Sequence, residues 1–163
     1  MASAAESFSK LTGRLDYPML VVTTAAEGER AGCLVGFSTQ CSIDPARFLV
    51  CVSDKNHTFS IARRGDALAV HLLGSDAEDL AALFGSETGD EVDKFTRCRW
   101  HPGPRGLPIL DSCDRWFAGE IRQRHGFGDH CGYVLEPFAV HDEDGSDSLS
   151  FSQVKRLTPG HEA

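Results

Sequence analysis

The sequence lacks any apolar run approaching the roughly 20 residues that a membrane-spanning helix requires. Its longest apolar stretch lies around residues 19–22 and is far too short. The first ten residues, MASAAESFSK, also lack the apolar core of a secretion signal. We therefore expect a cytoplasmic protein that does not associate with membranes.

Positive charge is also scarce. The chain has 16 Lys and Arg against 24 Asp and Glu, which gives a net charge of −8 at pH 7. The basic residues are scattered, whereas binding to nucleic-acid phosphates requires clustered Lys and Arg. The composition therefore argues against a nucleic-acid partner.

Paired cysteine motifs are absent. The six cysteines occur singly, without a CxxC pair, at positions 33, 41, 51, 98, 113 and 131. Several lie in apolar segments, where a free cysteine acts as a small buried hydrophobe. The seven histidines have no fixed spacing to them. We expect reduced thiols, with neither a disulfide framework nor a metal site.

The chain has no GxGxxG or Walker-type loop and no βαβ alternation, so a doubly wound dinucleotide fold is disfavoured. Sixteen glycines and seven prolines favour short strands joined by turns. We expect one mainly β domain, a barrel with Greek-key topology and a few short inserted helices. Its parts are a polar, helix-compatible lead-in at 1–16, the barrel at 17–153 and a frayed polar tail at 154–163.

Apolar and β-branched segments predict seven strands, at 17–25, 31–39, 47–53, 67–74, 114–125, 128–141 and 148–152. The first two form a hairpin across a turn at 27–29. Helices are expected at 56–65 and at 75–87, the second capped by Ser75 or Asp76. We expect a loop at 89–108 and an acidic turn at 142–147.

The segment 32–45 is unusual for a core strand, because small and polar residues stand where bulky β-formers pack better. They are Gly32, Gly36, Ser38, Thr39, Gln40 and Ser42. Glycine in a strand marks either a close approach of a ligand to the backbone or a bulge that turns a barrel. From the residues alone, the two interpretations are about equal.

Two further clusters could carry chemistry. Ser53, Lys55, Asn56, His57 and Thr58 stand between a strand and a helix start, where free N–H groups favour phosphate. An ordinary helix cap with Asn56 as the capping residue explains the same pattern.

In the second cluster, HGFGDHCGY, Asp129 could orient the ring of His130. A glycine-rich hairpin in which an Asp–His pair only stabilises the turn is the plainer alternative.

Taken in order, several segments resemble the flavin reductase-like family of FMN-binding split barrels. The matching segments are VVTT (21–24), GCLVGFSTQCSIDP (32–45), FLVCVS (48–53), KNHTF (55–59), DKF (93–95), GLPILD (106–111) and GDH (128–130). The resemblance spans residues 17–151, and it rests on the order and spacing of motifs rather than on any one of them.

The resemblance implies a split β-barrel that binds FMN, with FAD as an alternative, and uses NADH or NADPH as co-substrate. The implied flavin-binding residues are Leu34, Val35, Gly36, Phe37, Ser38, Thr39, Ser53, Lys55, Asn56, His57, Thr58 and Phe95. His130 is the implied catalytic-site residue, a positioning group beside the flavin face where nicotinamide docks. The resemblance also implies a homodimer with sites at the subunit boundary, and a partner monooxygenase.

The chain departs from the family pattern at several positions. Family members often have Thr and Ser in place of Leu34 and Gly36, Phe followed by Thr at positions 38 and 39, and a second Pro at Ala46. Backbone contacts to a flavin ring survive such changes, whereas side-chain contacts to the ribityl phosphate need not.

Three functions stay open at this point. The leading hypothesis is an NAD(P)H-dependent flavin reductase, in which the cofactor supplies the chemistry and the protein stacks the rings. The alternative is an FMN-binding electron carrier without its own nicotinamide-dependent activity. A related split-barrel enzyme acting on an organic substrate is the third, although haem is disfavoured because no CxxCH motif occurs.

Overall fold

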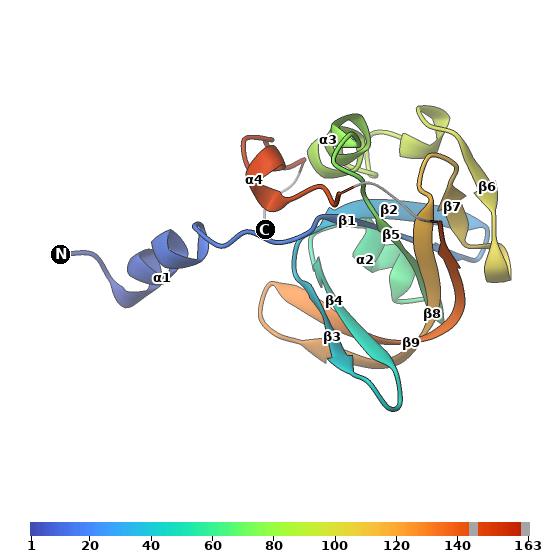
Figure 1. Cartoon of the computed structure of the whole chain (residues 1–163), viewed down its shortest axis with the longest axis horizontal. Helices are drawn as coiled ribbons and strands as arrows, with labels where there is room; N and C mark the ends of the chain where they lie inside the picture. Colours follow the sequence, from blue (N-terminus) through green and yellow to red (C-terminus); the bar gives the residue numbers. More distant parts are fainter. Residues whose placement is uncertain (144–146, 161–163) are drawn as a thin grey trace.

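The computed structural model describes residues 1–143 and 147–160. The fold is mainly β, as the sequence predicts (Figure 1). Its strands are β1 (Leu20–Ala26), β2 (Glu29–Val35), β3 (Ser38–Ser42), β4 (Arg47–Ser53), β5 (Ala67–Leu72), β6 (Trp100–Pro102), β7 (Pro108–Leu110), β8 (Arg115–Gly126) and β9 (His130–Asp142). Its helices are α1 (Ala4–Thr12), α2 (His57–Ala62), α3 (Glu78–Ser86) and α4 (Phe151–Val154), with 3₁₀ turns η1 (Lys94–Thr96) and η2 (Pro104–Gly106).

Seven antiparallel strands form one curled sheet in the order β2-β1-β5-β8-β9-β4-β3 (Figure 1). The predicted first hairpin is confirmed, with Ala26 paired to Glu29. Glu27 and Gly28 between them have φ angles of 53° and 81°. Two successive left-handed residues match the twist of the flanking strands, which fixes the register of β1 against β2.

The predicted strand 31–39 is wrong, because it is divided between two strands at opposite edges of the sheet. β2 ends at Val35 and β3 begins at Ser38, so Gly36 and Phe37 alone join the two edges. The Cys51 N–H donates to the Phe37 carbonyl at 2.9 Å. The chain therefore closes the sheet on itself at Gly36 and Phe37, which period-two patterning along one segment does not reveal.

Two other predictions need correction. The expected loop at 89–108 contains η1, β6 and η2, and its last residue begins β7, which pairs with β6. The expected strand at 148–152 makes only isolated bridges at Ser148 and Ser150, after which α4 begins at Phe151. Three-residue strands next to Pro and Gly carry almost no periodic signal, which is why β6 and β7 were not predicted. Part of the expected acidic turn lies outside the described residues.

Helix α3 begins later than expected. Its N-cap is Ala77 rather than Ser75 or Asp76, and no side chain caps it. The residues from 154 to 160 are also not detached from the domain, because Val154 is buried against the cluster that contains Phe84. The Gly160 N–H further donates to the Gly85 carbonyl at 3.3 Å.

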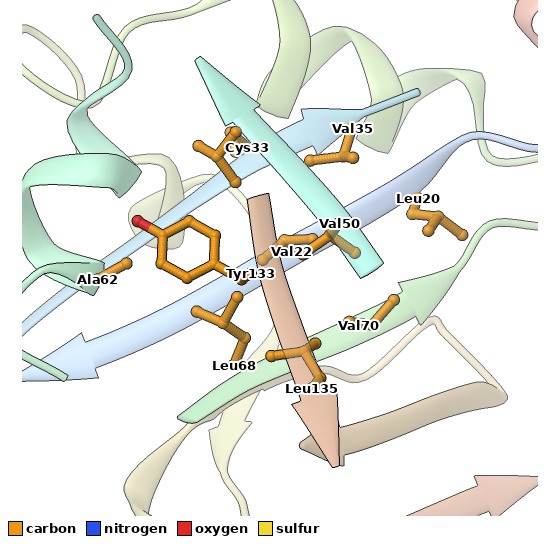
Figure 2. Close-up of a cluster of buried hydrophobic side chains, with 11 residues drawn as sticks. Leu20, Val22, Cys33, Val35, Val50, Ala62, Leu68, Val70, Tyr133 and Leu135 are labelled. Atoms are coloured by element: carbon orange, nitrogen blue, oxygen red, sulfur yellow. The ribbon is translucent and has the colours of Figure 1, made fainter. Parts of the chain in front are cut away.

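The core of the curled sheet consists of aliphatic side chains around Tyr133 (Figure 2). Val50 and Leu135 project from the neighbouring strands β4 and β9, and Leu68 from β5, each with 0% of its surface exposed. Full burial of such a side chain contributes about 1.5–3 kcal/mol to the free energy of unfolding. The core thereby fixes the strand ends that surround the pocket described below.

A buried histidine joins three strands beside this core. His71 on β5 is fully buried, and its Nδ1 lies 3.0 Å from the Val21 carbonyl of β1. The Leu110 N–H of β7 donates to its Nε2 at 3.1 Å. Burial lowers the pKa of His71 to about 4. The neutral ring, protonated on Nδ1, satisfies both contacts at once.

Helix α1 projects away from the sheet (Figure 1), and none of its residues is buried. Its Ser3–Glu6 capping box provides hydrogen-bond acceptors for free N–H groups of the first turn. Phe8 and Leu11 are exposed. Among the described residues, no helix is long and apolar enough to cross a membrane.

Candidate functional site

A cavity of about 380 Å³ opens where the two edges of the sheet meet. Its walls are the end of β2 with Gly36 and Phe37, the end of β4, the first residue of β9, and the C-terminal segment 151–159. Seven of the residues predicted to bind the cofactor or act on it line this one cavity: Leu34, Val35, Gly36, Phe37, Ser53, Asn56 and His130. We call it the ring pocket.

The main chain of β2 presents hydrogen-bonding groups on the side away from β1. The Gly32 carbonyl accepts a hydrogen bond from Lys94 Nζ at 3.0 Å, so it points away from β1. Main-chain groups alternate in direction along a strand, so those of Leu34, two residues later, point the same way. A planar ligand that carries alternating donors and acceptors on one edge can pair with them.

The lack of a side chain at Gly36 is explained by Tyr17, which packs against the backbone there. A Cβ atom at this position would lie 2.5 Å from Cε2 of Tyr17 and 3.4 Å from Sδ of Met19. The Tyr17 ring is itself stacked on Phe151 at 4.7 Å between centroids. Gly36 therefore stands where family members often have Ser because Tyr17 occupies the space of a side chain.

His130 is held at the mouth of the pocket by its own turn. Its Nδ1 lies 2.7 Å from Oδ1 of Asp129, and its ring centroid lies 5.1 Å from that of Phe37. The Asp129 carbonyl accepts a hydrogen bond from the Asp54 N–H at 2.9 Å. Hydrogen bonding to His130 lowers the pKa of Asp129. The carboxylate thus fixes the orientation of the imidazole.

At the start of α2, Asn56 acts as the helix cap. Its Oδ1 accepts from the Thr58 N–H at 2.9 Å, and the Ser53 hydroxyl accepts from the Lys55 N–H at 3.3 Å. Both Ser53 and Asn56 also line the ring pocket. The capping interpretation is therefore confirmed, and the same turn forms part of the pocket wall.

The other predicted residues lie elsewhere. Ser38 lines a neighbouring cleft beneath α1, and Thr39 is exposed, with its hydroxyl bonded to the Gln40 carbonyl at 3.1 Å. Lys55 is exposed and does not line the ring pocket, while Thr58 is buried beside the Cys33 thiol.

The last two predicted residues face a second cavity. His57 points into a cavity of about 390 Å³ between β2 and residues 89–95, where its Nδ1 lies 2.9 Å from Asp90 Oδ1. Phe95 lines that cavity too, but it is 5% exposed and packs edge-on against Phe84 and Trp100. Neither residue reaches the mouth of the ring pocket beside His130.

Sequence reasoning missed one whole wall of the ring pocket. The C-terminal segment contributes Phe151, Val154, Lys155, Leu157 and Pro159. One signal was available, because Ser150 and Gln153 have the spacing of a capping box, and the Ser150 N–H donates to Gln153 Oε1 at 3.1 Å. That spacing predicts a helix start at Phe151, within the segment that was expected to be a strand.

The fold and this pocket define a class: small, mainly antiparallel β proteins with a ligand-sized cavity at the junction of two sheet edges. The flavin reductase like domain model matches residues 12–158 of the chain. The chain therefore belongs to the flavin reductase like family, as the order of its motifs predicts.

Relatives within this family are moderately similar. The NADH-dependent FMN reductase RutF of Ancylobacter novellus is 31% identical over 152 residues, with 92% of this chain and 82% of the relative covered. The reductase component of 4-hydroxyphenylacetate 3-monooxygenase from Escherichia coli is 27% identical over 119 residues, with 71% and 69% covered. The crystal structure of an FMN-binding protein from Thermus thermophilus superimposes with a TM-score of 0.75 at 28% identity, covering 81% of this chain and 74% of that one.

Proposed function

We propose that the protein is an NADH-dependent flavin reductase that takes FMN in the ring pocket. The observation that carries the proposal is one cavity lined both by residues 34–37 and by His130. A flavin ring that is hydrogen-bonded to the main chain of β2 would lie near His130, whose orientation Asp129 fixes. Leu34, Val35, Ser53 and Asn56 would hold the flavin, which when bound would supply the hydride-accepting chemistry.

The residues of the pocket fit a flavin. Leu34 and Val35 give an apolar wall, and Leu34 adds main-chain groups that match the polar edge of the ring. Ser53 and Asn56 give polar contacts for the ribityl chain. Gly36 lets Tyr17 pack directly against the backbone of the pocket wall, because any side chain there would collide with the Tyr17 ring.

His130 orients the second ring rather than moving a proton. Hydride transfer needs close stacking and exclusion of water, which positioning supplies. The exposed ring of Phe37, 5.1 Å from the His130 ring, adds an apolar face at the same mouth.

The names of the relatives support this assignment. RutF of Ancylobacter novellus is named as an FMN reductase that uses NADH. The Escherichia coli relative is the reductase component of a monooxygenase, which supports a partner monooxygenase for this protein. The Thermus thermophilus protein is named as FMN-binding, and its crystal structure holds 1-cyclohex-2-enone. The name fits the alternative of a flavin carrier, and the bound enone fits that of an enzyme acting on an organic substrate.

One experiment separates the reductase from the carrier. Purified protein is mixed with FMN and NADH, and nicotinamide absorbance is followed over time, with NADPH and FAD in parallel. We expect NADH to be consumed in proportion to protein concentration. Flavin binding without loss of nicotinamide absorbance would refute the reductase and favour the carrier.

Three further assignments belong to this proposal. The joining of both sheet edges at Gly36 and Phe37 supports a split barrel. The exposed face of α1 with Phe8 and Leu11 supports a homodimer, because a nine-residue helix that buries none of its residues is marginal in water. The six free cysteines fit a reducing, cytoplasmic location. Sedimentation velocity at several protein concentrations tests the homodimer.

A further inference from the structure

The C-terminal segment forms a fixed wall of the ring pocket. The Phe151 N–H donates to the Tyr17 carbonyl at 2.8 Å, and Val154 is 5% exposed. At the far end, the Gly160 N–H donates to the Gly85 carbonyl of α3 at 3.3 Å. Lys155 lies between these anchors and lines the pocket.

The charge of this pocket differs from that of the whole molecule. The protein has a net charge of −8, yet no Asp or Glu occurs among the described residues that line the ring pocket. Lys155 is the one Lys or Arg of that lining within the described part of the chain. A cavity that no described Asp or Glu lines, and that a lysine lines, favours an anionic ligand.

One charged neighbour of Lys155, Asp16, makes its hydrogen bonds to another residue. Asp16 lies within electrostatic reach of Lys155, but its carboxylate accepts hydrogen bonds from the Ser152 N–H at 2.9 Å and from the Ser152 hydroxyl at 3.0 Å. The next cation along the chain, Arg156, turns elsewhere, donating to Glu78 at 3.2 Å and to the Gln153 carbonyl at 3.2 Å.

We propose that Lys155 binds a phosphate group of the nucleotide held in the ring pocket. The proposal rests on the proposed function, which supplies two phosphate-bearing ligands: FMN with its ribityl phosphate and NADH with its diphosphate. An ammonium group serves phosphate as a point charge without strict geometry. This places a specificity contact on the C-terminal segment, outside the Ser53–Thr58 turn.

The test compares Lys155→Met with Arg156→Met, a neighbouring exposed cation that does not line the pocket. Dissociation constants for FMN and for riboflavin, which lacks the phosphate, are measured by flavin fluorescence at low salt. The KM for NADH is measured in the same samples. We expect Lys155→Met to weaken one phosphate-bearing ligand about three- to tenfold, the range between an exposed ion pair and a charged hydrogen bond. Arg156→Met should match wild type.

The pattern of losses identifies which phosphate is bound. Weaker binding of FMN with unchanged binding of riboflavin assigns Lys155 to the ribityl phosphate. A higher KM for NADH alone assigns Lys155 to the diphosphate. Either difference should shrink at about 0.5 M salt, because screening acts on exposed charges. Equal weakening of FMN and riboflavin, or no change in any ligand, would overturn the inference. If wild type binds neither flavin, the proposed function fails instead.

Discussion

A methyl group at Gly36 would lie 2.5 Å from Cε2 of Tyr17, well inside van der Waals contact. The Tyr17 ring cannot retreat freely, because it stacks on Phe151 at an interplanar angle of 13°. The two residues thus set the width of the ring pocket together.

We expect Gly36→Ala to displace Tyr17 and to weaken FMN binding about tenfold, since overpacking a fixed site costs on the order of 1–3 kcal/mol. Flavin fluorescence titration measures the loss. The double variant Gly36→Ala with Tyr17→Leu should recover part of the affinity, because the smaller side chain vacates the contact. If the double variant binds FMN no better than Gly36→Ala, the clash is not the cause.

His130→Ala should leave the dissociation constant of FMN within about twofold while lowering kcat/KM for NADH about tenfold, because positioning is lost but the flavin contacts remain. His125→Ala is the matched control on the same hairpin, since His125 bonds to Gln123 and stacks on Phe127. Steady-state kinetics at several pH values give the readout. His130→Asn should restore part of the activity without changing its pH profile. If His130→Ala has the kinetics of wild type, His130 does not position the nicotinamide.

His71 should make the fold less stable in mild acid. Its pKa is about 4 in the folded protein against 6.5 for an unperturbed histidine, with burial as the main cause. The folded state therefore binds fewer protons between these values. The contribution of His71 is complete above pH 6.5 and declines as the pH falls towards 4. From pH 7 to pH 5 the loss is about 2 kcal/mol.

Urea unfolding at pH 7 and at pH 5 measures this loss. His71→Gln should be less stable at pH 7, because contacts to Val21 and Leu110 are lost, but its stability should fall less between the two pH values. His125→Gln, an exposed control, should keep the wild-type slope. An equal pH dependence in wild type and His71→Gln would show that another group governs acid stability.

Lys94 ties the β2 edge to α3. Its ammonium is buried, with the residue 4% exposed, and donates to the Gly32 and Phe84 carbonyls at 3.0 Å each. Burial lowers the pKa of Lys94. Lys94→Met leaves two buried carbonyls without this donor, at about 1–3 kcal/mol each, partly offset by relief of a buried charge. We expect a net loss of about 1–3 kcal/mol in the free energy of unfolding.

Thermal and urea unfolding of Lys94→Met, with the exposed Lys10→Met as control, test this prediction. FMN affinity should fall as well, since Gly32 lies two residues before Leu34 on the ligand-facing edge of β2. An unfolding free energy equal to that of wild type would mean that water or a neighbouring group replaces the ammonium.

The sequence by itself determined the class of fold, most of the long elements and the family. Apolar alternation located β4, β5, β8 and β9, and the Glu27–Gly28 turn located the first hairpin, because these signals are local. The order of motifs from VVTT to GDH was also enough to name the flavin reductase like family. The resemblance also named seven of the 18 described residues that line the ring pocket, including residues 34–37 and His130.

Only the tertiary structure decided how the pocket is closed. The break at Gly36 and Phe37 depends on two sheet edges meeting, which is a long-range property that no single segment encodes. The resemblance names His57 and Phe95 as flavin-binding residues, and the packing of α3 and residues 89–95 places both at a second cavity. The C-terminal wall with Lys155 looked like a polar tail, because its anchors at Tyr17 and Gly85 lie far away along the chain.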